Sequence, residues 1–287
     1  SQCTNAIGEL IAGEGTVEPE PDGESPKVGD YFFNDGTWNA NLTDANKINC
    51  VGIVYATEIQ TGDNVTDYGG SSSGKNILGY VISLKSLDAG GKELYMYNKT
   101  SSPAVFPTLP KKAEAADGQE WNNDITTNNG YHKTQILLQH FTTNSGAATD
   151  NYPALKCFYD WKGLSVVDHA SDWYIPSAQQ ILVAVGRFQG FTPADLGASD
   201  NDFKSEVSSE IVSIPALQTA LANAKTAGIA EDVLPPSGTM LSSSLSNHKS
   251  GPAPIHIQVN KGKINRIKEG NGDSRVFTIR PILTILK

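Results

Sequence analysis

Short runs of apolar residues, many of them β-branched or aromatic, indicate the strands of this chain. Early in the sequence they occur at 28–33, 50–55 and 77–84, and the run at 94–97 is a candidate continuation. Residues 50–55 and 77–84 are apolar at successive positions, which predicts strands buried on both faces rather than edge strands. The Asn-Asp-Gly sequence at 34–36 predicts a hairpin turn after the first strand.

Apolar positions spaced three and four residues apart predict helices in the middle of the chain. These helices are expected at 153–163, 178–189 and 214–227. The segment 98–150 has no clear period and is predicted to be mainly loop, with one apolar patch at 136–138.

Strand patterns return near the end, with alternation at 255–259 and 263–267 and one long final strand at 276–286. His256 alternates with two isoleucines, so its side chain is expected to face solvent. The order of strands, helices and strands predicts an α+β fold with antiparallel sheets and segregated helices, rather than alternating βαβ units.

The clearest local signal is an apolar strand at 172–175 that stops at a proline and continues as a helix. Trp173 is expected in the core, and Pro176 ends the strand. Ser177 is placed as the N-cap of the helix, and Gln180 is its capping-box partner three residues later. This stretch contains no obvious catalytic group, so its predicted role is structural.

Only 18% of the 287 residues are charged, and the formal net charge is −9. A chain that is acidic and has no basic stripe is a poor partner for nucleic acid and for anionic lipid. The sequence has no run of ~18 apolar residues, so no transmembrane helix is expected. Residues 1–27 are acidic and rich in Pro and Gly, which predicts a flexible tether, whereas 28–287 are expected to form a single domain.

Three widely spaced cysteines, Cys3, Cys50 and Cys157, do not have the spacing of a disulfide framework or a zinc site. Cys50 and Cys157 lie in apolar surroundings and are expected to be small buried hydrophobic residues. The chain begins at Ser1 without Met, as a mature or trimmed form does, and a lipid anchor near the N-terminus is compatible with that start.

Four segments in this order resemble the C-type-lectin-like domain family of Bacteroidales-type surface and fimbria-associated proteins, a family largely of unknown function. The segments are VGDYFFNDGTW at 28–38, VGIV at 51–54, DWYIPS at 172–177, and LSSS at 241–244 followed by 255–259 and FTIRPI at 277–282. They contain the residues expected to be structural, which are Trp38, Trp173, Pro176, Ser177, Gln180, Arg280 and Pro281.

The resemblance implies a C-type-lectin-like fold in which the first and last strands pair, two helices flank the sheet, and long loops lie at one end. It also implies export to the cell surface, often with a lipid anchor. The chain departs from the family pattern in three respects: Leu241 replaces the usual tryptophan, about 190–240 form a helical insertion, and lectin-type disulfides are absent.

One segment has the chemistry of a calcium and sugar site. Trp121, Asn122, Asn123 and Asp124 place carboxylate and amide oxygens beside an aromatic ring, and such oxygens can bind Ca²⁺ and sugar hydroxyls together. In C-type lectins the corresponding motif follows both helices, whereas here it precedes them. The alternative interpretation, an ordinary polar loop, therefore stays open. No catalytic residues and no other metal ligands are indicated.

The leading functional hypothesis is a secreted or surface-anchored, non-enzymatic adhesion domain that recognises a glycan or a host or fimbrial protein through long loops. The alternative is a structural or assembly component of a fimbria-like surface appendage. A hydrolase or modifying enzyme on the same scaffold is the third class. A fold resemblance alone does not decide among them.

Overall fold

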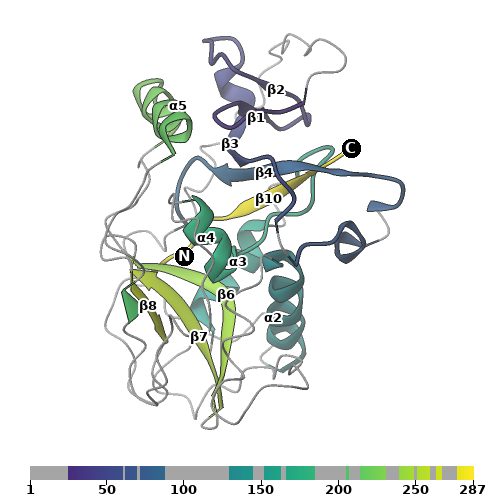
Figure 1. The fold of residues 1–287 in the computed structure, drawn as a ribbon, viewed down its shortest axis with the longest axis vertical. Coiled ribbons are helices and arrows are strands. Elements are labelled where there is room, and N and C mark those ends of the chain that lie inside the picture. Colours follow the sequence, from purple (N-terminus) through teal and green to yellow (C-terminus); the bar gives the residue numbers. More distant parts are fainter. Residues whose placement is uncertain are drawn as a thin grey trace.

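The computed structural model describes 25–60, 62–69, 72–87, 129–144, 152–162, 166–184, 205–206, 214–230, 239–248, 251–258, 263–266 and 277–287. In these ranges the chain forms two five-stranded sheets and four α-helices (Figure 1). The predicted α+β class is confirmed. The predicted strand at 94–97 and residues 1–24 of the predicted tether lie outside the described residues.

The first sheet is antiparallel throughout and has the strand order β10-β4-β3-β1-β2. Its strands are β1 (Tyr31–Phe33), β2 (Trp38–Asn39), β3 (Cys50–Ala56), β4 (Ile77–Ser83) and β10 (Ile282–Leu286). The strands predicted at 50–55 and 77–84 are confirmed, and both lie inside the sheet because each has a partner on either side.

Side chains from the two faces of this sheet enter two separate hydrophobic clusters. Phe32 belongs to one cluster, whereas its neighbours Tyr31 and Phe33 belong to the other. Helices α2 (Gly130–Asn144) and α3 (Pro153–Lys162) contribute to the first cluster. Helix α5 (Pro215–Thr226) and the end of α4 (Ala178–Ala184) contribute to the second. Helices therefore cover both faces, as buried strands require.

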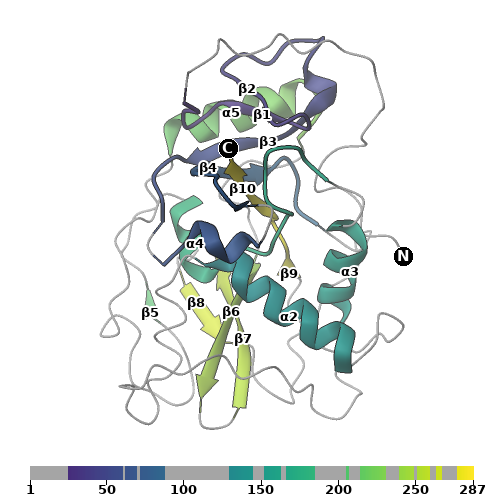
Figure 2. The same ribbon diagram turned by 90° about the vertical axis from the view of Figure 1, so that its right-hand side faces the viewer.

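The second sheet has the order β5-β8-β7-β6-β9 and is antiparallel except for the parallel pair of β6 and β9. Its strands are β5 (Ser205–Glu206), β6 (Thr239–His248), β7 (Gly251–Gln258), β8 (Lys263–Arg266) and β9 (Phe277–Thr278). In both views β6, β7 and β8 lie at the opposite end of the long axis from α5, β1 and β2 (Figures 1 and 2).

Helix α2 corrects the prediction that 98–150 are mainly loop. Its apolar or buried positions Thr134, Leu137, Leu138 and Phe141 repeat at helical spacing and face the core. The flanking His132 and Thr142 are weak helix formers, so the helical spacing of the apolar residues is hard to recognise in the sequence. Packing against β6, α3 and the first hydrophobic cluster, rather than local propensity, stabilises this helix. The helices predicted at 153–163 and 214–227 are confirmed as α3 and α5.

The end of the chain also differs from the prediction. The expected strand at 276–286 is divided into β9 and β10 around Arg280 and Pro281, since proline has no N–H to donate to a ladder. The first and last strands are not paired as the resemblance implied: β10 pairs with β4, and β1 pairs with β2 and β3. In this arrangement the two largely buried strands β3 and β4 each have a neighbouring strand on both sides.

Two single-residue expectations are wrong. His256 is fully buried rather than facing solvent, because β7 lies between β6 and β8 and is covered on both faces at this point. Cys157 is disulfide-bonded, to a partner outside the described residues, whereas Cys50 is free and buried as predicted. A single bridge between distant residues produces no spacing pattern, which explains why the sequence did not indicate it.

Candidate functional site

The strand-to-helix turn before α4 joins three parts of the core. Ser177 N donates to Gln180 Oε1 at 3.1 Å, and Gln180 N donates to Ser177 Oγ at 3.2 Å, which are the two bonds of the predicted capping box. Gln180 Oε1 also accepts from Gly130 N at 3.1 Å, and so connects the start of α2 to α4. Trp173 is almost fully buried. The turn is therefore part of the scaffold.

A buried polar network centred on Asp63 lies next to this turn. The Asp63 carboxylate accepts from the Tyr68 hydroxyl at 2.8 and 2.9 Å and from the Tyr80 hydroxyl at 2.6 Å. Thr284 Oγ1 lies 2.8 Å from the Tyr68 hydroxyl and 2.9 Å from that of Tyr174. The network thus connects the 3₁₀ helix η2 (Val65–Tyr68), β4, β10 and the segment before α4.

Burial dominates the electrostatics of this network. It raises the pKa of Asp63 to about 6, although the hydrogen bonds from Tyr80 and Tyr68 act in the opposite direction. Burial also raises the pKa values of Tyr68, Tyr80 and Tyr174, so these hydroxyls stay protonated. No local pattern in the sequence indicates the network, because its members come from segments far apart in the chain.

The serines at 242–244 are also structural. All three are fully buried in β6. Ser244 Oγ accepts from Ala178 N at 3.0 Å and from the buried Lys133 Nζ at 3.3 Å, and Ser243 N donates to Pro176 O at 2.9 Å. These bonds attach β6 to the start of α4 and to α2. The contacts given for this segment are therefore structural.

Arg280 has the largest buried charged side chain in the described residues, and it contacts backbone. Its Nε donates to Ser83 O at 2.7 Å, and its Nη2 donates to Leu84 O at 3.0 Å. The guanidinium therefore pairs carbonyls at the end of β4, where the ladder with β10 stops. Trp38 and Pro281 are buried as well.

The predicted ligand-binding residues Trp121, Asn122, Asn123 and Asp124 lie outside the described residues. Within the described ranges, no group of three or more His, Cys, Asp or Glu side chains has the arrangement of a metal site. The calcium and sugar role of this segment stays a prediction.

A surface pocket of about 340 Å³ lies between α5 and the loop after β2. It is lined mainly by Tyr31, Asn41, Leu42, Asn223, Thr226 and Ala227. The Tyr31 hydroxyl donates to Ala220 O at 3.2 Å. The sequence did not predict this pocket, because its two walls are about 180 residues apart in the chain.

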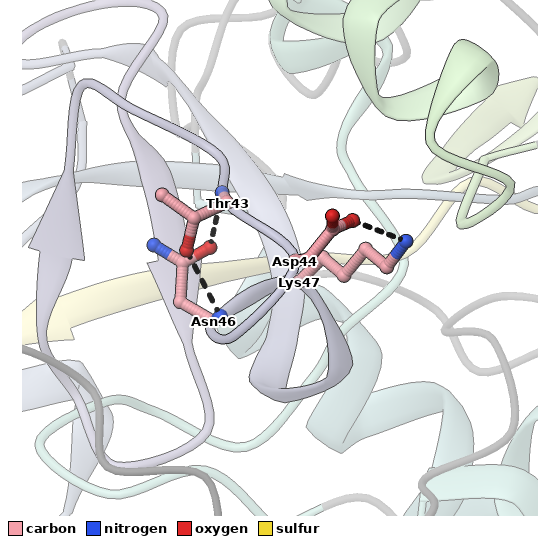
Figure 3. A network of polar contacts seen from close by, with 4 residues as sticks. All are labelled: Thr43, Asp44, Asn46 and Lys47. Atoms are coloured by element: carbon pink, nitrogen blue, oxygen red, sulfur yellow. Dashed lines mark hydrogen bonds and ion pairs between the residues drawn. The ribbon is translucent and has the colours of Figure 1, made fainter.

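The loop that forms one wall of the pocket is held by its own polar contacts. Thr43 N donates to Asn46 Oδ1 at 2.8 Å, and Asn46 N donates to Thr43 Oγ1 at 3.2 Å (Figure 3). The buried Asn46 also donates from Nδ2 to Asn41 O at 3.0 Å. An exposed ion pair joins Asp44 and Lys47 at 2.9 Å (Figure 3). These contacts fix the conformation of this wall.

The described strand edges offer little backbone for a partner strand. The outer side of β10 is covered by 169–174, through bonds that include Ser171 N to Thr284 O at 2.8 Å. The edge strands β2, β5 and β9 have two residues each. Short or covered edges resist strand addition.

The far half of β7 is protected in another way. Among the described residues, positions 251–254 of β7 pair with β6 alone, and they include Pro252 and Pro254. Both Pro252 and Pro254 lie in the register of β7 with β6, and proline has no N–H to donate to a further strand. An added strand would find no N–H donor at either position.

No family model matches this chain, and no curated protein matches it. Among solved structures, it is similar to a fimbrial protein from Bacteroides ovatus ATCC 8483, with 18% sequence identity and a TM-score of 0.52. The match covers 90% of this chain and 48% of the other, so this chain spans about half the length of that protein. The likeness shows a shared fold. Both the fimbria-associated part and the C-type-lectin-like part of the resemblance stay predictions.

Among the described residues, no helix combines the length and apolar character needed to cross a membrane.

Proposed function

We propose that this chain is a non-enzymatic component of a fimbria-like surface appendage. The observation that carries the proposal is the fold that it shares, over 90% of its length, with a fimbrial protein. The alternative given by the sequence is therefore favoured over the leading hypothesis of a ligand-binding adhesin. The similar protein is about twice as long as this chain.

Two features of the described residues support the proposal. The disulfide at Cys157 suits an oxidising environment outside the cytoplasm. The buried groups that could support catalysis, Asp63, Lys133 and Arg280, bond to the scaffold. Because the described strand edges are short, covered or interrupted by proline, contacts with other subunits through these edges are expected to involve side chains more than added strands.

The test is to locate the protein on the cells that produce it. Antibodies raised against the purified chain should label surface appendages in immunogold electron microscopy, and the protein should sediment with appendages sheared from the cells. A strain that lacks the gene is the control for specificity. Labelling confined to the cell interior, or appendage fractions free of the protein, would overturn the proposal.

A glycan-binding adhesin is the second candidate, and the pocket beside α5 is the observation that favours it. A second place to look for glycan binding is the segment at 121–124, and a glycan array with and without Ca²⁺ tests it. Calcium-dependent binding that is lost on Asp124→Ala would support the adhesin. Absence of binding in both conditions would contradict a role for that segment.

A further inference from the structure

We propose that Cys3 is the disulfide partner of Cys157, so that the N-terminal segment is a strap fastened to the domain at both ends rather than an open tether. This pairing does not depend on a role in an appendage. The inference rests on the number of cysteines in the chain, on the place of each described cysteine in the fold, and on the reach of the segment.

The cysteine content of the chain leaves one partner. Cys157 is disulfide-bonded within a single chain that has only two other cysteines, Cys3 and Cys50. Cys50 is a free thiol, and its Sγ donates to Gly52 O at 3.5 Å. The partner of Cys157 is therefore Cys3.

The fold separates Cys50 from Cys157. Cys50 lies in β3 and belongs to the hydrophobic cluster that includes α5, whereas Cys157 lies in α3 and packs against the cluster on the opposite face of the first sheet. A disulfide requires two Cβ atoms that point toward each other, and the Cβ of Cys50 points to the face away from α3. These two cysteines could pair only if the core were rearranged.

Cys157 is placed where a surface segment can reach it. In α3 the side chains of Ala154, Phe158 and Trp161 are buried, and that of Tyr159 is exposed. Cys157 lies one turn from Ala154 and from Trp161 and is half-buried, so it borders the core face of the helix. A disulfide at this border can fasten a segment to the surface without opening the core.

The other end of the segment is attached to the domain by backbone contacts. Lys27 N donates to Asp30 Oδ2 at 2.8 Å, and Gly29 N donates to Val54 O at 2.8 Å. The stretch from Cys3 to the start of these contacts, about 22 residues, can span up to roughly 75 Å. A domain of this length has a radius of gyration of about 19 Å, so the segment is long enough to reach α3.

The bond has two consequences. A sulfur in a disulfide has no free valence for a lipid thioether, so Cys3 does not carry a lipid anchor. Closing the strap removes one hydrogen from each thiol and passes two electrons to the disulfide of a thiol–disulfide exchange catalyst, which is reduced to a dithiol. Such oxidation takes place in compartments outside the cytoplasm, so the strap closes during or after export.

The experiment is tryptic peptide mapping of the full chain, exported to the periplasm of an expression host and alkylated with iodoacetamide during denaturation. Without reductant, the peptides 1–27 and 157–162 should be recovered as one linked species, which reductant separates. The alkyl label should lie on Cys50, in the peptide 48–75. In denaturing electrophoresis without reductant the chain should migrate as a monomer, which shows that the bond is intramolecular.

Cys3→Ser tests the assignment, and Cys50→Ser is its matched control. Cys3→Ser should add a label on Cys157, because the substitution leaves that thiol without its partner. Cys50→Ser should remove the label from the peptide 48–75 and leave the linked species unchanged, since Cys50 takes no part in the bond.

Several results would overturn the inference. These are a linked species that joins 157–162 to 48–75 or to a second copy of itself, a disulfide-linked dimer in electrophoresis, and alkylation of both Cys3 and Cys157 in the parent chain. An unlabelled Cys157 in Cys3→Ser would also contradict it. The map of the parent chain needs no variant, so it decides the pairing even if a substitution prevents folding.

Discussion

Replacing Asp63 by asparagine should change how the free energy of unfolding depends on pH. Asp63 is buried and accepts hydrogen bonds from Tyr68 and Tyr80. Asparagine has nearly the same shape and keeps one carbonyl oxygen as an acceptor, but it does not titrate. The variant therefore removes the ionisation of this group and leaves most of the packing intact.

The magnitude follows from the two pKa values of the carboxyl. Burial raises the pKa of Asp63 to about 6 in the folded protein, against ~3.9 in an unfolded chain. A pKa difference of one corresponds to ~1.4 kcal/mol, so the full effect is about 3 kcal/mol. The folded state holds this proton more tightly. The stabilisation is fully present below pH ~4 and is lost as pH rises to ~6, because the unfolded chain releases the proton first.

The assay is urea unfolding of the parent chain and of Asp63→Asn between pH 4 and 8, in steps of half a unit. We compare the free energy of unfolding of the parent with that of the variant at each pH. Because all other carboxyl groups are common to both, the difference (parent minus variant) is the contribution of Asp63. This difference should fall by about 2 kcal/mol from pH 4 to 6.5, since the unfolded chain is already half ionised at pH ~4, and then stay level. Asp168→Asn, at an exposed position, reports the background effect of a lost surface charge.

A difference that is constant across this range would refute the reasoning, since it would mean that Asp63 has the same pKa in both states. A difference that rises with pH would also refute it, because the hydrogen bonds would then outweigh burial. Tyr80→Phe provides an internal check: it removes a donor to the carboxylate, so the midpoint of the transition should move above pH 6.

Three further predictions concern the scaffold. Gly130→Ala should lower the free energy of unfolding by about 1–3 kcal/mol, because a Cβ would overlap atoms of the turn at 177–180; circular dichroism in urea measures it. Arg280→Met should lower it by about 2–4 kcal/mol by leaving two buried carbonyls unpaired, and an unchanged urea midpoint would contradict this. After denaturation without reductant, peptide mapping should find iodoacetamide on Cys50 but not on Cys157, because Cys157 is held in a disulfide. In the native protein Cys50 should not react, because burial raises the pKa of its thiol to about 12.

Local signals in the sequence predicted the elements that depend on local chemistry. The apolar runs of β3 and β4 identify them as buried strands, and the spacing of Ser177 and Gln180 identifies the start of α4. Local signals do not identify helix α2, because its stability comes from contacts with β6, α3 and the first hydrophobic cluster, and its own residues have only a weak helical period. The split before β10 could have been inferred from Pro281, which cannot donate to a ladder.

Features that depend on distant residues could not be predicted in this way. Asp63 interacts with Thr284 through Tyr68, across more than 200 residues of sequence. The pocket beside α5 likewise requires two segments that only the fold brings together. A single sequence specifies such contacts through the whole fold, and no local pattern records them.

The position of β10 has a consequence for how the protein reaches its native state. Ile282 pairs with Ile82, a partner 200 residues earlier. A ribosome or an export channel releases the chain from its N-terminal end. Until β10 emerges, the side of β4 that pairs with it has no partner strand. Pairings of high sequence separation form slowly, and the waiting edge is open to association with other chains. Partner proteins that shield β4 during this interval would raise the yield of folded protein without affecting its final stability.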